Sequence, residues 1–191
     1  MKVAVFCGSS VPRQEAYMQA ARALGERLAG AGHTLVYGGS NLGMMGAVSG
    51  GALEAGGAVV GVIPTFFSEE IIRSQPVSEL VRVRSRGERK EYIIAESDAF
   101  VALPGGIGTL DEVFTVAASA TIGYHQKMVV LYNVGGFWDP LIRLLDDLGQ
   151  RGMVRGDWRQ HIGVVSTTAE LQRFSHLLPL TTHLLPLTTH L

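Results

Sequence analysis

A glycine-rich segment, Pro104-Gly105-Gly106-Ile107-Gly108-Thr109-Leu110-Asp111-Glu112, combines an anion-binding pattern with a carboxylate placed shortly after it. The segment follows a short apolar run and precedes a stretch with helical periodicity. Glycines let the backbone approach an anion closely, and free N–H groups at the start of a helix point toward it. Thr109 adds a hydroxyl donor. The segment therefore predicts a phosphate site, although the same glycines also suit a tight turn between a strand and a helix.

Glu112 is the residue of this segment that could do chemistry. It lies three residues after Thr109, about one helical turn, so both side chains can face one ligand. A carboxylate beside an anion site is useful if it acts on another part of the ligand, for example as a general base. The alternative is a structural one, in which Glu112 and Asp111 are acidic residues favoured by the dipole of the helix.

A second polar segment, Arg86-Gly87-Glu88-Arg89-Lys90, begins where a predicted strand ends. Charged residues at the start of a helix are commonly solvated and have no other role. In a parallel sheet, however, ligands bind beyond the carboxyl ends of the strands, and this segment lies at that position.

Several other chemistries are not indicated. The first strand is not followed by the Gly-x-Gly-x-x-Gly pattern of dinucleotide sites, and no glycine loop ends in Gly-Lys-Ser/Thr, so neither a nicotinamide cofactor nor ATP is expected. Cys7 is the only cysteine, which excludes an intrachain disulfide and a cysteine-built zinc site. We expect no metal and no cofactor.

The elements that must position these loops alternate between short apolar runs and segments of helical period. We expect strands at residues 3–7, 35–37, 58–63, 79–84, 99–103, 128–132 and 162–165. Helices are expected at about 13–29, up to about 54, at 88–97, up to about 122, and at 138–148 and 169–174, with a mixed, partly helical region at 65–76. Right-handed βαβ units of this kind predict a three-layer α/β fold, a doubly wound, Rossmann-like parallel sheet of six or seven strands.

The composition fits one domain, which we place at residues 1–175. With 47% hydrophobic residues and a net charge of -1, the chain is neither disordered nor basic enough to suggest a nucleic-acid partner. No apolar run is long enough for a membrane helix, so a cytoplasmic protein with a small-molecule partner is expected. Residues 176–191 form a repetitive tail, because Leu177–His183 recurs as Leu184–His190 with a helix-breaking proline in each copy.

Taken together, these segments resemble the LOG (Lonely Guy) family of phosphoribohydrolases, whose members often carry the label of lysine decarboxylase. The resemblance covers residues 2 to about 165. Its most specific parts are the Arg89-Lys90 pair and the later Pro-Gly-Gly-x-Gly-Thr-x-x-Glu motif. Other family-like segments are Val5–Ser10, Val36–Gly39, Gly43–Gly46, Gly61–Pro64, Asp98–Glu112 (which includes that motif), Gly123–His125 and Asp139–Leu141.

The resemblance implies a homodimer that hydrolyses the N-glycosidic bond of a purine, cytokinin-type nucleoside 5′-monophosphate to give free base and ribose 5-phosphate. Some family members act on AMP. The family's catalytic arginine and glutamate map onto Arg89 and Glu112. Its substrate contacts map onto Glu70, Lys90, Gly105, Gly106, Ile107, Gly108, Thr109, Leu110 and Asp111.

Six positions depart from the family pattern. Arg86-Gly87 replaces Met-His, Ala118-Ser119 replaces Thr-Trp, Thr121 replaces a glutamine, and Met128 replaces a proline. Loss of an aromatic and a hydroxyl near the expected pocket leaves the preferred base open between a cytokinin and adenine.

Other functions remain as alternatives. A non-catalytic nucleotide-binding protein could use the same fold, since a fold does not determine a function. A pyridoxal-phosphate decarboxylase needs a Schiff-base lysine in a much larger fold, and the chain has only Lys2, Lys90 and Lys127. A nucleic-acid-binding relative would be expected to carry an extended basic stripe.

Overall fold

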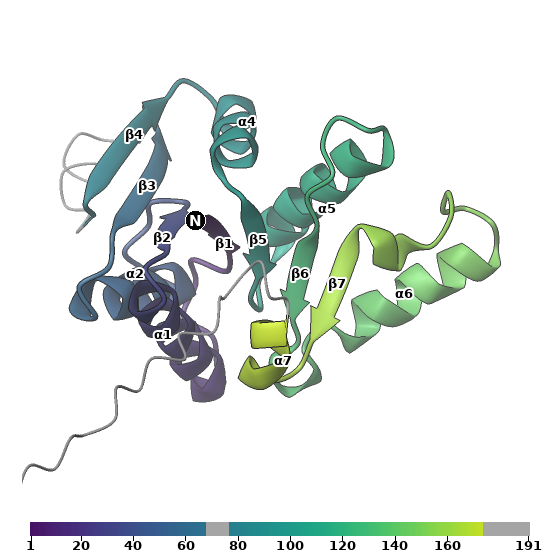
Figure 1. The fold of residues 1–191 in the computed structure, drawn as a ribbon, viewed down its shortest axis with the longest axis horizontal. Helices are drawn as coiled ribbons and strands as arrows, with labels where there is room; N and C mark the ends of the chain where they lie inside the picture. The colour runs from purple at the N-terminus through teal and green to yellow at the C-terminus, as the bar shows by residue number, and fades with distance from the viewer. Residues whose placement is uncertain (68–76, 174–191) are drawn as a thin grey trace, which may run out of the picture.

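A computed structural model describes residues 1–67 and 77–173, and within them seven strands form one parallel sheet (Figure 1). The order across the sheet is β4-β3-β2-β1-β5-β6-β7. The strands are β1 (Lys2–Phe6), β2 (Thr34–Tyr37), β3 (Val59–Pro64), β4 (Glu79–Val83), β5 (Ala99–Ala102), β6 (Val129–Tyr132) and β7 (Ile162–Val165).

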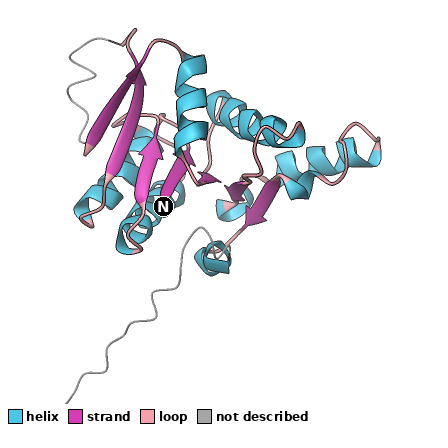
Figure 2. Ribbon diagram, turned by 45° about the horizontal axis from the view of Figure 1, so that its top comes forward, coloured by secondary structure: helices cyan, strands magenta, loops and turns pink. Residues whose placement is uncertain are grey.

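Helices cover both faces of this sheet, which makes the predicted three-layer, doubly wound architecture (Figure 2). The described helices are α1 (Glu15–Gly30), α2 (Gly43–Glu54), α4 (Arg86–Glu96), α5 (Ile107–Thr121), α6 (Asp139–Gln150) and α7 (Thr168–Arg173), with single 3-10 turns at Val134–Gly136 and Trp158–Gln160.

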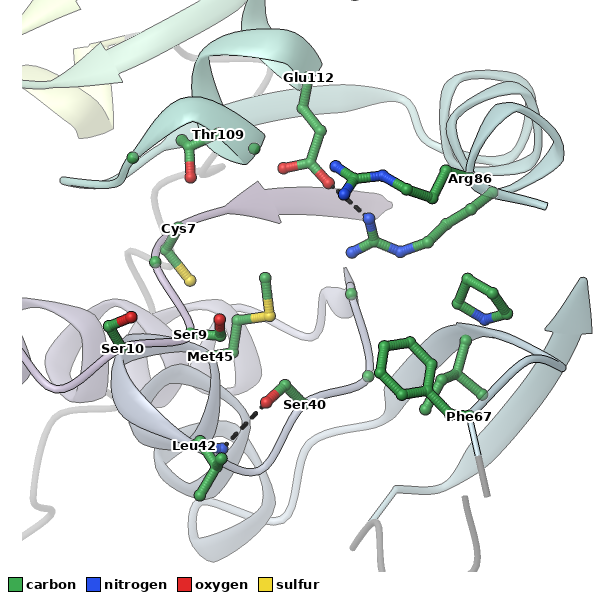
Figure 3. Close-up of a pocket in the computed structure, with 18 of the residues that line it drawn as sticks. Cys7, Ser9, Ser10, Ser40, Leu42, Met45, Phe67, Arg86, Thr109 and Glu112 are labelled. Carbon is green, nitrogen blue, oxygen red and sulfur yellow. Dashed lines mark hydrogen bonds and ion pairs between the residues drawn. The ribbon is translucent and has the colours of Figure 1, made fainter. Parts of the chain in front are cut away.

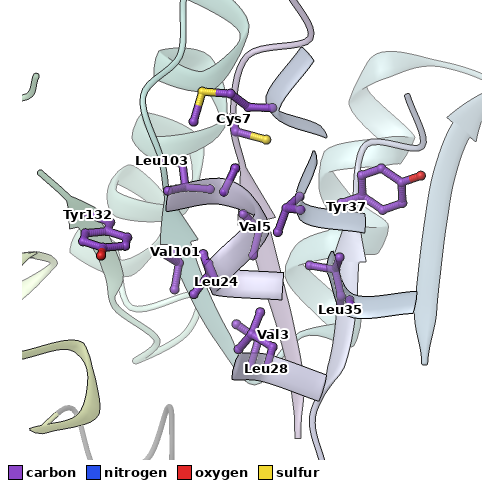
Figure 4. Close-up of a cluster of buried hydrophobic side chains, with 14 of the residues drawn as sticks. Val3, Val5, Cys7, Leu24, Leu28, Leu35, Tyr37, Val101, Leu103 and Tyr132 are labelled. Carbon is purple, nitrogen blue, oxygen red and sulfur yellow. The ribbon is translucent and has the colours of Figure 1, made fainter. Parts of the chain in front are cut away.

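The central strands are buried on both faces because they contain apolar residues without alternation. In β1, Val3 and Val5 point into the core that α1, α2 and α7 cover, part of which is drawn in Figure 4. Ala4 and Phe6 point into the opposite core, which α4, α5 and α6 cover. One strand therefore supplies side chains to both layers.

The strand order reverses between β1 and β5. From β1 the chain builds outward through β2 and β3 to β4, and then returns to the other side of β1 with β5. At such a reversal the loops that leave the carboxyl ends of the strands separate to opposite faces and open a crevice. The loops after β1, β2, β3 and β5 therefore border the same crevice.

Helix α4 begins at Arg86, two residues before the predicted start. Ser85 is its N-cap, because its Oγ accepts a hydrogen bond from the backbone N–H of Glu88 at 3.1 Å. This Ser-x-x-Glu spacing is a helix-start signal that outweighs the low helix propensity of Gly87.

The other elements match the predicted ones to within a few residues. Most of the mixed region at 65–76, and the repetitive tail at 176–191, lie outside the described residues. Among the helices of the described ranges, none is both long and apolar enough to cross a membrane.

Candidate active site

A cavity of about 630 Å³ lies over the reversal of the strand order, at the carboxyl ends of the central strands (Figure 3). Its polar side is formed by the start of α4 and the start of α5, and its other side by the loops after β1, β2 and β3. The lining residues with charged or polar side chains are Ser9, Ser10, Ser40, Asn41, Arg86, Arg89, Thr109 and Glu112.

An ion pair between Arg89 and Glu112 forms the centre of the polar side. Nη1 of Arg89 donates to Oε1 of Glu112 at 2.8 Å, and the two side chains are 11% and 5% exposed. Nε of Arg89 donates to the backbone oxygen of Val62 at 3.0 Å, which holds the guanidinium against the end of β3. Helices α4 and α5 thus bring together a cation and a carboxylate that are 23 positions apart in the chain.

The environment of Glu112 disfavours its charged form. Burial raises the pKa of the Glu112 carboxyl above its usual value of 4.5, while the charge and hydrogen bond of Arg89 act in the opposite direction. A carboxyl of this kind holds a proton more strongly than an exposed glutamate does. It is therefore better suited to accept a proton from water near neutral pH.

Cys7 also lines the cavity but is not activated. Burial, together with the negative charge of Glu112, raises the pKa of the Cys7 thiol far above its usual range. The neutral thiol is a poor nucleophile, so Cys7 contributes shape to the cavity.

The glycine-rich segment makes the turn from β5 into α5. Gly106 is the N-cap and α5 starts at Ile107, so the N–H groups of the first helical turn have no partner within the helix. Thr109 folds back over the turn, because a Cβ on Gly105 would lie 2.1 Å from Thr109 Oγ1. The Thr109 hydroxyl points toward the cavity in Figure 3. The segment has the geometry of an anion site.

Comparison with known proteins assigns the chain to a family. A family model described as "Possible lysine decarboxylase" matches residues 45–174. The cytokinin riboside 5'-monophosphate phosphoribohydrolase LOG of Oryza sativa subsp. japonica is 40% identical over 170 residues, which cover 89% of this chain and 70% of that protein. This chain belongs to the LOG family.

Further relatives agree with the assignment. LOG5 of Arabidopsis thaliana, a protein with the same activity name, is 40% identical over 169 residues, covering 88% of this chain and 74% of its own. The molybdenum cofactor carrier protein of Chlamydomonas reinhardtii has a similar structure, with a TM-score of 0.69, 26% identity, and coverage of 93% of this chain and 97% of the carrier. The LOG relatives make this chain an enzyme of the phosphoribohydrolase class.

The residues that the LOG resemblance assigned to the site fall into two groups. Arg89, Gly106, Gly108, Thr109 and Glu112 line the cavity. The remaining residues do not line it or are not described: Gly105 forms the turn, Ile107 is exposed, Leu110 packs against the core under α5, Lys90 and Asp111 pair with each other, and Glu70 lies outside the described residues.

The pair of Lys90 and Asp111 lies between α4 and α5. Nζ of Lys90 donates to Asp111 Oδ1 at 2.8 Å and to Thr115 Oγ1 at 3.1 Å. This pair connects the two helices that carry Arg89 and Glu112. Lys90 therefore supports the Arg89–Glu112 ion pair without lining the cavity.

Sequence reasoning did not identify the apolar wall of the cavity. It consists of Leu42, Met45, Ile63, Pro64, Phe66 and Phe67. The rings of Phe66 and Phe67 lie with centroids 4.6 Å apart, and both side chains are exposed. The usable signal was position alone: the wall residues lie at the end of β3, in the loops after β2 and β3, or at the start of α2.

The replacement of the family's Thr-Trp by Ala118-Ser119 was expected to lie near the pocket, but it lies on another surface. Neither residue lines the cavity, and Ser119 Oγ donates to the backbone oxygen of Thr115 at 2.7 Å. Arg86, by contrast, does line the cavity.

Within residues 1–67 and 77–173 no cluster of histidine, cysteine or acidic residues could hold a metal ion.

Proposed function

We propose that this LOG-family enzyme hydrolyses the N-glycosidic bond of a purine nucleoside 5′-monophosphate, releasing the free base and ribose 5-phosphate. The observation that carries the proposal is the buried Arg89–Glu112 pair, whose Nη1 and Oε1 lie 2.8 Å apart in the wall of a nucleotide-sized cavity.

The first turn of α5 is the site for the 5′-phosphate. The free N–H groups after Gly106 and the hydroxyl of Thr109 supply donors, and the helix dipole favours an anion at this end. Its first turn contains no acidic residue that would compete with the ligand. Binding the phosphate here restricts where the ribose can lie.

The apolar wall is the site for the base. Phe66, Phe67 and Met45 offer apolar surfaces against which a planar purine can pack. Phe67 and Met45 lie on the side of the cavity away from α5 (Figure 3). Leu42 and Ile63, together with the ring of Phe67, extend this surface beyond the purine and can accommodate an apolar substituent on the base. The wall therefore favours an isopentenyl-substituted adenine over unsubstituted adenine.

Glu112 then lies near the ribose, between phosphate and base. As the bond from C1′ to the base nitrogen breaks, its electron pair leaves with the base, and positive charge develops on C1′ and the ring oxygen. The Glu112 carboxylate stabilises that charge and accepts a proton from the water whose oxygen bonds to C1′. Arg89 holds the carboxylate in place by its hydrogen bond and opposes the rise in the Glu112 pKa that burial causes. The departing base takes up one proton from solvent, and Glu112 releases to solvent the proton that it accepted from the water, so that free base and ribose 5-phosphate are formed and the carboxylate is restored.

The experiment is a comparison of four substrates: AMP, isopentenyladenosine monophosphate, and the two corresponding unphosphorylated ribosides. Base release, followed by chromatography, is expected for the monophosphates and to be at least about a hundredfold slower for the ribosides, since remote binding energy is lost with the phosphate. Binding of the monophosphates in calorimetry without release of base would instead identify a nucleotide carrier.

Glu112→Gln and Arg89→Ala provide the matched variants. Each is expected to lower base release by a factor of about 100 to 10,000, in line with loss of general-base catalysis, while the circular dichroism spectrum stays that of the native protein. Full activity in either purified variant would contradict the assignment.

The proposal extends to a homodimer located in the cytoplasm. The family resemblance implies the dimer, and exposed apolar side chains on and just after α5 support it, namely Ile107, Phe114, Ile122 and Tyr124. Sedimentation of the purified protein distinguishes a dimer from a monomer.

A further inference from the structure

Three carboxylates around the starts of α4 and α5 each have a cation as partner. Glu88 Oε2 accepts from the backbone N of Arg84 at 2.8 Å and from its Nε at 3.1 Å. The other two pairs are Asp111 with Lys90 and Glu112 with Arg89. In the described parts of the chain, these three carboxylates are therefore already paired.

Arg86 is the additional cation at this place. It lines the cavity, and it forms no hydrogen bond or ion pair with any residue in the described parts of the chain, 1–67 and 77–173. Among the described residues, the ionisable side chains that line the cavity, Cys7 apart, are Arg86, Arg89 and Glu112, and together they carry one positive charge more than they carry negative charges. An anionic ligand would balance it.

The charge of Arg86 lies near the carboxylate of Glu112, whose pKa it lowers, and near two helix N-termini, which disfavour a cation. Arg86 is the first residue of α4, where the helix dipole disfavours a cation. Its guanidinium also reaches the first turn of α5, because Nη2 lies 3.7 Å from the place a Cβ on Gly108 would take. The side chain thus lies at the positive ends of two helices. An anion bound between these groups would interact favourably with both helix N-termini and with the guanidinium.

We propose that Arg86 binds the 5′-phosphate of the nucleotide together with the first turn of α5, and so sets the preference for monophosphates over ribosides. The inference rests on the proposed function for the orientation of the ligand. Arg86 replaces a methionine of the usual family pattern, so this contact would be missing in relatives that have methionine at this position.

Arg86→Gln tests the inference, with Arg151→Gln as the matched control. Arg151 is an exposed arginine that follows α6 and does not line the cavity, so its replacement changes the net charge equally. The probes are ribose 5-phosphate and ribose, titrated by calorimetry, because neither is turned over. Arg86→Gln is expected to weaken ribose 5-phosphate binding about tenfold or more, the usual size of a charge-assisted hydrogen bond.

Stability provides the second readout. If Arg86 only supported the fold, its removal would lower the melting temperature; here Arg86→Gln is expected to leave it unchanged or raise it, since a cation leaves two helix N-termini. Added ribose 5-phosphate should raise the melting temperature of the wild type and of Arg151→Gln more than that of Arg86→Gln.

The outcomes separate this inference from the proposed function. Wild-type binding of ribose 5-phosphate without hydrolysis of any monophosphate would reject the proposed function and leave the inference in place. Equal binding of ribose 5-phosphate by the wild type and Arg86→Gln, or no binding by either, would overturn the inference even in an active enzyme.

Discussion

Gly38 leaves open the space that the guanidinium of Arg89 occupies. A Cβ at residue 38 would lie 1.8 Å from Nη2 of Arg89, well inside the contact distance of real atoms. The loop after β2 therefore determines where the cation on α4 can lie. This relationship joins two family-like segments, Val36–Gly39 and the Arg89-Lys90 pair, that are unconnected in the sequence.

Gly38→Ala is expected to displace the Arg89 guanidinium and lower kcat by about a hundredfold, as misplacement of a catalytic group by about 1 Å commonly does. The measurement is steady-state base release from a nucleoside monophosphate. Gly30→Ala at the end of α1 is the control, because nothing lies within 4 Å of the added Cβ. Equal activity in the two variants would show that the position of Arg89 is not critical.

The pH dependence of kcat/KM should report the carboxyl of Glu112. The reaction needs the ionised form, so activity should rise with pH through a pKa above the usual 4.5, because burial raises it. In Arg89→Ala the opposing charge is removed, so the pKa of Glu112 rises further and the acid limb moves to higher pH. Residual activity of the variant at high enzyme concentration is enough for this profile. An acid limb at the same pH in both proteins would assign it to another group.

The free energy of unfolding should also depend on the ionisation of Glu112. It should fall as the pH rises through the pKa of Glu112, in the range where the activity increases. Since the pKa of Glu112 is raised on folding, the folded state binds the proton more strongly than the unfolded state does. Its contribution to stability is full below the unfolded pKa, about 4.5, and is lost as the pH rises through the folded pKa. The melting temperature of Glu112→Gln, relative to the wild type, should therefore increase between pH 4 and pH 7. Thermal unfolding of both proteins in a pH series measures this difference in melting temperature. A difference that does not change with pH would contradict the raised pKa of Glu112.

Phe67→Ala should change the choice of base without changing the phosphate site. Removing this ring from the apolar wall is expected to raise KM for isopentenyladenosine monophosphate about tenfold, close to the energy of one lost aromatic contact, and to raise KM for AMP less. Binding of ribose 5-phosphate, which has no base, is the internal control and should stay unchanged. An equal effect on both nucleotides would mean that the ring contacts the purine and not its substituent.

Much of the fold follows directly from local patterns in the sequence. The apolar runs of β1, β2, β5 and β6 are short and lack alternation, which is typical of strands buried on both faces, and helix-length segments separate them. The phosphate loop could be predicted for the same reason, because a glycine-rich turn and the helix start that follows it are contiguous in the chain.

The composition of the cavity could not be predicted in this way, because it depends on which loops the strand order brings together. Glu112 and Arg89 were named on family motifs, but their 2.8 Å contact exists because α4 and α5 cover the same face of the sheet. Phe66 and Phe67 lie in an irregular loop with no periodic signal, and only the path of the chain after β3 turns them toward the cavity.

What the sequence determined by itself was the set of elements and the chemical groups at their ends, since backbone propensity, apolar periodicity and glycine turns act over a few residues. The tertiary structure decided which of those groups share one cavity. It paired Glu88, Asp111 and Glu112 with their cations and left Arg86 facing the cavity, while Ala118 and Ser119 lie outside its lining. Electrostatic balance of this kind is a property of distances between elements, and those distances are set only when the sheet and its two helical layers pack together.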